Sequence, residues 1–133
     1  MSSALSAVSR DPRISRWSFY RYVVAIDPER FAGRTNQVVC DALEAEGVGA
    51  WTGYEPMSNY DLFQPSLSRL PVAVDHADRL DPSRMSFPVA EAAGLRESVY
   101  IDENVFRSDR AGVEQAIEAL AKIQRHATEL PGG

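Results

Sequence analysis

Apolar residues gather in a few short stretches of this chain, and their spacing predicts its secondary structure. From Trp17 to Ile26 the sequence is aromatic and β-branched, which is typical of a strand. Toward its end apolar side chains fall on both faces, so we expect helices or loops to cover the strand on both sides. Asp27 and Pro28 then end it, because this dipeptide favours a turn.

The segment from Arg34 to Glu46 has the period of an amphipathic helix. Its apolar stripe consists of Val38, Val39, Ala42 and Leu43. Thr35 is a candidate N-cap, and Gly47 occupies the position where a left-handed residue commonly ends a helix. We therefore expect a helix followed directly by a second short strand, from Val48 to Trp51.

Residues 52 to 84 lack any clear periodicity, and regular patterns return only after them. A stretch this long without regular structure is usually functional or disordered. Its aromatic residues argue against plain disorder. Beyond it we expect a short helix from Phe87 to about Leu95, a strand from Val99 to Ile101, and a closing helix that begins after Ser108 or Asp109 and reaches about Thr128.

The order of these elements predicts an α+β fold, in which helices pack on a small antiparallel or mixed sheet. A length of 133 residues corresponds to one domain. We expect that domain to span residues 17–130. Residues 1–16, rich in Ser, Arg and Asp, are interpreted as a flexible lead-in or as the remnant of a connection to an upstream domain.

Composition narrows the function classes. The net charge of −5 argues against nucleic acid or an anionic membrane as the main partner. A single cysteine makes no internal disulfide and favours a reducing, cytoplasmic location. The sequence holds no apolar run near the roughly 20 residues that a membrane span needs, and its first residues do not have the pattern of a signal peptide.

Few residues are candidates for chemistry. Lys122 is the only lysine, so Schiff-base chemistry on this chain would have to use it, yet its pattern is that of an exposed helical lysine. His76 stands among carboxylates in a polar segment, which favours a solvated loop over a metal site. Cys40, beside the helical stripe, is expected to be a small buried side chain. We therefore predict neither a catalytic residue nor a metal ligand.

The segment from Trp51 to Pro65 is chemically the richest part of the chain. It combines hydroxyls, an amide, carboxylates and aromatic faces. That mixture suits recognition of a polyhydroxylated ligand. It suits equally a loop that packs its aromatic side chains onto a neighbouring domain, and residue chemistry alone leaves both interpretations open.

Three short segments carry a resemblance to a known family: Tyr54-Glu-Pro-Met-Ser-Asn59, Leu62-Phe-Gln-Pro65 and Phe87-Pro-Val-Ala-Glu91. With them, the stretch from about residue 17 to 130 resembles the C-terminal small domain of the DegT/StrS-type sugar and cyclitol aminotransferases, specifically the cyclitol, scyllo-inosose-like branch. The sequence departs from that pattern at Ser58, an extra residue, and at Phe63, where the branch has a tyrosine.

The resemblance implies a role in amino sugar or aminocyclitol biosynthesis. Family members are fold-type I homodimers that use pyridoxal phosphate to move an amino group from glutamate or glutamine to a keto-sugar or keto-cyclitol. Their Schiff-base lysine and most cofactor ligands lie in a large domain without a counterpart here. The resemblance therefore implies a large domain or partner subunit that holds the cofactor, with none bound to this chain alone.

On this interpretation the chain is the C-terminal part of a truncated or split aminotransferase, inactive by itself. Tyr54 and Asn59 are the positions that the resemblance assigns to substrate binding. The alternative is a free-standing, non-catalytic binding or regulatory module that kept the fold, because a fold does not fix a function.

Overall fold

A computed structural model describes residues 5–7 and 11–132 of the chain. Four strands form one sheet in the order β1-β2-β4-β3, and all its pairs are antiparallel. The strands are β1 (Leu5–Ala7), β2 (Arg21–Ile26), β3 (Ala50–Trp51) and β4 (Ser98–Asp102). The predicted α+β class is confirmed, and the sheet is antiparallel throughout rather than mixed.

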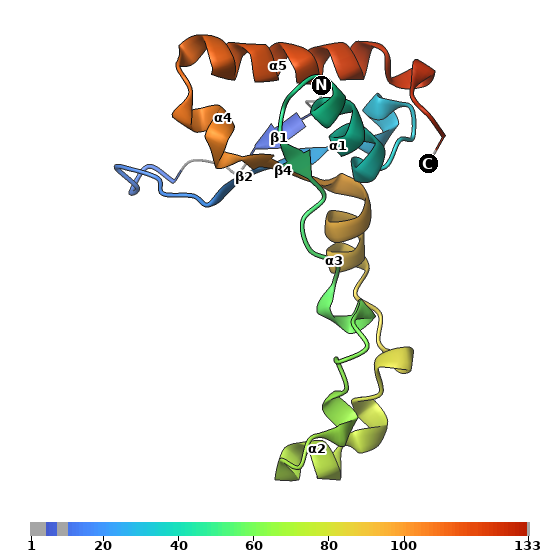
Figure 1. The fold of residues 1–133 in the computed structure, drawn as a ribbon. Helices are drawn as coiled ribbons and strands as arrows, with labels where there is room; N and C mark the ends of the chain where they lie inside the picture. Colours follow the sequence, from blue (N-terminus) through green and yellow to red (C-terminus); the bar gives the residue numbers. More distant parts are fainter. Residues whose placement is uncertain (1–4, 8–10, 133) are drawn as a thin grey trace.

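Three helices, α1 (Asn36–Ala45), α4 (Glu103–Arg107) and α5 (Arg110–Arg125), lie beside the sheet (Figure 1). The core forms where one face of the sheet meets α1 and α5. Its largest fully buried apolar side chains are Phe31, Leu43, Val39 and Val99. Burying such side chains contributes about 1.5–3 kcal/mol each, so this interface holds the folded domain together.

The opposite face of the sheet is only partly covered. Along β2, Val24 and Ile26 are buried, whereas Val23 and Ala25 between them are half-buried. The expectation that this strand is covered on both sides is therefore wrong within the described chain. The strand also begins at Arg21 rather than at Trp17. The apolar run therefore belongs to an inner strand of the sheet that has one face in the core and the other face only partly covered.

The ends of α1 agree with the sequence in part. Gly47 has a φ of +82°, and the next amide, Val48 N, donates to the carbonyl of Leu43 at 2.9 Å. This is the predicted left-handed helix end, which satisfies carbonyls of the last turn. Thr35 stands at the N-cap position, but its side chain makes no capping hydrogen bond.

The closing helix α5 begins after Asp109, whose Oδ1 accepts a hydrogen bond from Gly112 N at 3.0 Å. Of the two predicted caps, Asp109 is thus the one that functions. The helix α4 and the strand β1 were not predicted from the sequence. Because β1 lies inside residues 1–16, and residues 1–4 and 8–10 fall outside the described part, the predicted boundary at residue 17 stays a prediction.

Between β3 and β4 the chain leaves the sheet as a long projection, and we call residues 52–92 the arm (Figure 1). The arm contains two short helices, α2 (Pro71–Asp75) and α3 (Pro88–Ala92), and several single 3₁₀ turns. Within it only Pro56 and Ala73 are buried. Its exposed large apolar side chains include Tyr54, Met57, Tyr60, Leu62, Leu67, Leu70, Val72, Val74 and Val89.

Candidate functional site

Tyr54, one of the two predicted substrate residues, stands where the arm leaves the sheet. Its side chain is 71% exposed, and its ring meets Trp51 edge-on with 5.1 Å between centroids. Trp51 in turn packs on Tyr100 at 5.4 Å. Such aromatic pairs contribute about 0.5–1.5 kcal/mol beyond their burial. Strands β3 and β4 therefore hold the base of the arm and present Tyr54 to solvent.

An ion pair lies beside this aromatic group. Arg21 and Asp102 are direct cross-strand partners of β2 and β4, and their side chains form a salt bridge. The Arg21 guanidinium also lies 5.7 Å from the Trp51 ring centroid and 5.2 Å from that of Tyr20, within the range of cation–π attraction. Sequence patterns did not single out Arg21, because only strand pairing brings it to Asp102.

Asn59, the second predicted residue, lies one turn further along the arm. Its Nδ2 is 3.4 Å from Oε2 of Glu55, which makes a long hydrogen bond on an exposed surface. A polar hollow of about 340 Å³ opens beside it. Residues with polar side chains around that hollow are Ser58, Asn59, Tyr60, Asp61, Gln64, Ser66, Asp81 and Ser83.

Tyr54 faces a different hollow, an apolar one of about 530 Å³ that is shared with Met57 and Leu62. Tyr60 and Phe63 border both hollows. The structure thus places Tyr54 and Asn59 on the same stretch of the arm, but in adjacent hollows of opposite character. One hollow offers apolar and aromatic surface, and the other offers hydroxyls, amides and carboxylates.

Asp81 gives the polar hollow a carboxylate that stays ionised. Its Oδ1 accepts hydrogen bonds from Ser83 Oγ at 2.7 Å and from Ser83 N at 3.0 Å. These bonds, led by that from the Ser83 side chain, lower the pKa of the Asp81 carboxyl. Together with the Asn59 amide, the hollow can accept and donate hydrogen bonds to a polyhydroxylated or amino-bearing ring.

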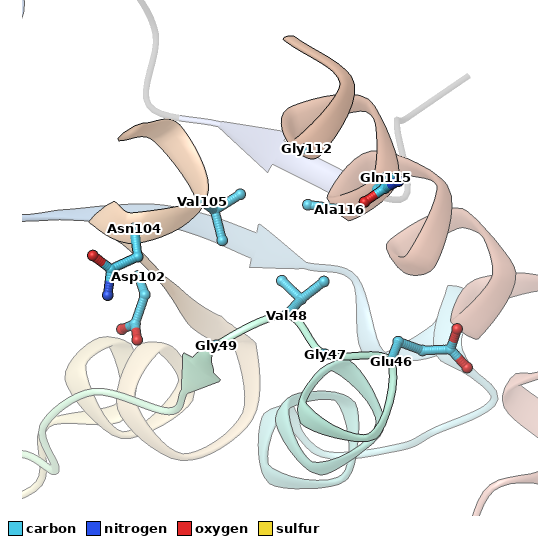
Figure 2. A pocket seen from close by; sticks show the side chains of 10 residues that line it. All are labelled: Glu46, Gly47, Val48, Gly49, Asp102, Asn104, Val105, Gly112, Gln115 and Ala116. Carbon is cyan, nitrogen blue, oxygen red and sulfur yellow. The ribbon is translucent and has the colours of Figure 1, made fainter. Parts of the chain in front are cut away.

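A third hollow, of about 390 Å³, lies between the end of α1, the start of β3, α4 and α5 (Figure 2). Its two carboxylates are already paired. Asp102 pairs with Arg21, and Glu46 Oε1 accepts from Lys122 Nζ at 2.7 Å. The amides of Asn104 and Gln115 remain, and they offer neither a nucleophile nor a general base, so this hollow supports no chemistry of its own.

The residues here do not fit pyridoxal phosphate. A Schiff base needs a lysine amine in an enclosed pocket, whereas the Lys122 side chain is 52% exposed and ion-paired with Glu46 at the end of α1. The exposed position of Lys122 agrees with the sequence prediction.

The remaining candidate residues occupy ordinary structural positions. Cys40 is buried, as predicted, and this burial, with the nearby charges of Asp41 and Glu44, raises the pKa of its thiol to about 12. His76 is exposed at the end of α2. Among the described residues, no group of three or more His, Cys, Asp or Glu side chains could hold a metal ion. In the same part of the chain, every helix is too short or too polar to cross a membrane.

Several known proteins are similar to this chain over most of its length. A protein of Streptoalloteichus tenebrarius, provisionally named L-glutamine:3-amino-2,3-dideoxy-scyllo-inosose aminotransferase, is 35% identical over 123 residues, which are 90% of this chain and 30% of the relative. A protein of the same provisional name from Streptomyces kanamyceticus is 30% identical over 123 residues, covering 90% of this chain and 29% of its own length.

A further relative from Streptoalloteichus tenebrarius, named L-glutamine:2-deoxy-scyllo-inosose aminotransferase, is 28% identical over 121 residues, covering 90% of this chain and 28% of the relative. No protein-family model matches the sequence. The chain therefore spans about 30% of the length of the curated relatives it matches. All three of these relatives carry the name of an aminotransferase for a scyllo-inosose cyclitol.

Proposed function

We propose that this chain serves as the small domain of a DegT/StrS-type aminotransferase that transfers an amino group from glutamine to a keto-cyclitol of the scyllo-inosose kind. The observation that carries the proposal is the 35% identity to the Streptoalloteichus relative over 90% of this chain. The family resemblance of the Tyr54–Asn59 and Phe87–Glu91 segments points to the same enzymes. Aminotransferases of this kind work with pyridoxal phosphate.

The chain contributes to such an enzyme without holding its cofactor. Lys122 is engaged with Glu46 at the surface of α5, so the Schiff-base lysine comes from a large domain or a partner subunit. The exposed apolar side chains of the arm support this arrangement, because apolar patches of such extent normally face a partner. Alone, the chain is inactive as a transaminase.

The role of the chain is to contact the acceptor. Tyr54 and Asn59 lie on one exposed stretch of the arm, next to hollows that offer an aromatic face and hydrogen-bonding groups. A cyclitol presents hydroxyls around an apolar ring, and the two kinds of surface match those two features. In this scheme Tyr54 packs on the ring and Asn59 hydrogen-bonds a hydroxyl, whereas the proton transfers belong to the large domain.

The experiment that tests this function uses the Streptoalloteichus relative that is 35% identical to this chain. The part of that relative outside the matching region is produced separately, loaded with pyridoxal phosphate and mixed with the full chain. We expect the two to form a complex by sedimentation, and binding of a hydrophobic dye to the chain to fall on mixing, because the arm becomes covered. Absence of a complex, with unchanged dye binding, would favour the free-standing module.

A further inference from the structure

Asn36 is the first residue of α1. Among the described residues, it is the one polar residue that is fully buried in the core. It is 1% exposed. Its Nδ2 donates to the carbonyl oxygens of Gly94 and Ser98, each at 3.0 Å, and its Oδ1 accepts from Gln37 N at 3.1 Å. Both amide hydrogens are therefore used on a segment far away in sequence. A buried amide with full hydrogen bonding specifies one arrangement of the elements it joins.

The segment that Asn36 holds is a π turn, Ala93–Glu97, which joins α3 of the arm to β4 of the sheet. Within it the amide of Ser98 donates to the carbonyl of Ala93, five residues earlier. Turns of this kind are rare and occur frequently at functional sites. The two carbonyls that Asn36 binds lie near the start and just past the end of this turn, so one side chain fixes the turn at two points.

The other side of the same turn lies against the outgoing base of the arm. An ideal Cβ atom on Gly94 would stand 2.9 Å from the carbonyl oxygen of Tyr54 and 3.2 Å from Cδ of Pro56. Glycine at this position therefore allows the segment by which the arm returns to β4 to touch the segment by which it leaves β3. A continuous set of contacts runs from Asn36 through Gly94 to the backbone of Tyr54.

We propose that Asn36 is a positioning residue, which sets the direction of the arm and thereby the place of Tyr54 and Asn59 relative to the sheet. The arm has few buried side chains of its own, so its orientation depends on its two connections to the sheet. The outgoing connection is fixed by the aromatic group at Trp51, and the returning one by the Asn36 amide. The link to acceptor binding rests on the proposed function, but the effect of Asn36 on the direction of the arm does not.

The experiment measures that direction on the full chain by pulsed electron paramagnetic resonance. Spin labels are attached to Val89→Cys on α3 and Gln115→Cys on α5, both of which are exposed. Cys40 stays unlabelled, because it is buried and the pKa of its thiol is raised to about 12. The distance distribution is compared for the labelled parent, Asn36→Leu, and the control Gln37→Leu, which alters an exposed neighbour on the same helix.

We expect the parent and Gln37→Leu to give the same single narrow distance, and Asn36→Leu to lose it in favour of a broad, shifted distribution. An unchanged distribution in folded Asn36→Leu would overturn the proposal and leave Asn36 a merely stabilising residue. If Asn36→Leu does not fold, Asn36→Ser replaces it, because a hydroxyl has one hydrogen to donate and cannot serve the carbonyls of both Gly94 and Ser98. An unchanged distance in folded Asn36→Ser would likewise overturn the proposal. Neither measurement requires transaminase activity, so the outcome is independent of the proposed function.

Discussion

The ring of Tyr100 occupies the space that a side chain at position 53 would need, and Gly53 holds a backbone φ of +79°. Two constraints thus meet at the residue where the chain turns from β3 into the arm. The first is the left-handed backbone, which L-residues disfavour. The second is steric, because any Cβ there overlaps the Tyr100 ring. Glycine satisfies both, and Tyr100 can then lie against Trp51.

Gly53→Ala should destabilise the domain through both constraints. Gly33→Ala is the matched control, because Gly33 has a φ of +75° with open space where its Cβ would be. Backbone strain alone should cost about 1–2 kcal/mol in the control. Gly53→Ala should lower the free energy of unfolding in denaturant by more than Gly33→Ala does. It should also shift the fluorescence of Trp51. Equal losses of unfolding free energy in the two variants would show that the packing of Tyr100 does not require glycine at position 53.

The N-termini of the two main helices offer a second comparison. Asp109 accepts the amide of Gly112 at 3.0 Å, whereas Thr35 makes no capping bond through its side chain. Asp109→Ala should therefore lower the free energy of unfolding by about 0.5–2 kcal/mol, a typical cost for a lost N-cap. Thr35→Ala should change it less. Chemical denaturation checks both, and a larger effect for Thr35→Ala would contradict this assignment of the caps.

Cys40 should make stability fall in alkaline solution. Burial raises the pKa of its thiol from the usual 9.0 to about 12, so the folded state binds the proton more tightly than the unfolded state. The contribution of this group is complete below pH 9.0 and is lost as the pH rises toward about 12. Urea unfolding across that range should show a steeper decline for the parent than for Cys40→Ala. Parallel declines would mean that the thiol is not shielded from water.

The local elements follow from sequence where short-range chemistry determines them. The apolar stripe ending in Leu43, the left-handed Gly47 and the capping Asp109 each act within one helix. The stripe and Gly47 were predicted correctly, and Asp109 was one of two predicted caps. In contrast, β1 is a three-residue strand whose partner is β2, so its pairing depends on long-range contacts. Ile117 of α5 is apolar but 64% exposed, because α5 is covered along one side only.

The direction of the arm could not be predicted either, because it depends on contacts between residues far apart in the sequence. Its direction depends on the bonds from Asn36 to Gly94 and Ser98, which join residues far apart in the chain. Nothing in the local sequence around Asn36 indicates those partners. The mixture of polar and aromatic residues between Trp51 and Pro65 is nevertheless visible in the sequence. The assignment of Tyr54 and Asn59 to substrate binding stays a prediction.

Asn59→Ala should weaken acceptor use in an active enzyme that contains this chain. Losing one hydrogen bond to a cyclitol hydroxyl costs on the order of 1 kcal/mol, which is several-fold in kcat/KM for the acceptor. The half-reaction with glutamine should change less. His76→Ala, an exposed position on the same arm outside both hollows, is the control for a general disturbance of the arm. Unchanged acceptor kinetics in Asn59→Ala would assign this stretch to packing alone.

The most direct measurement is glutamine-dependent amination by a chimaera, in which this chain replaces the matching 30% of the Streptoalloteichus relative. If the chain is the small domain of a cyclitol aminotransferase, the chimaera aminates a scyllo-inosose substrate, and the relative lacking that part does not. A chimaera that folds and takes up pyridoxal phosphate, yet aminates neither 2-deoxy-scyllo-inosose nor its 3-amino-2,3-dideoxy analogue, would contradict the account.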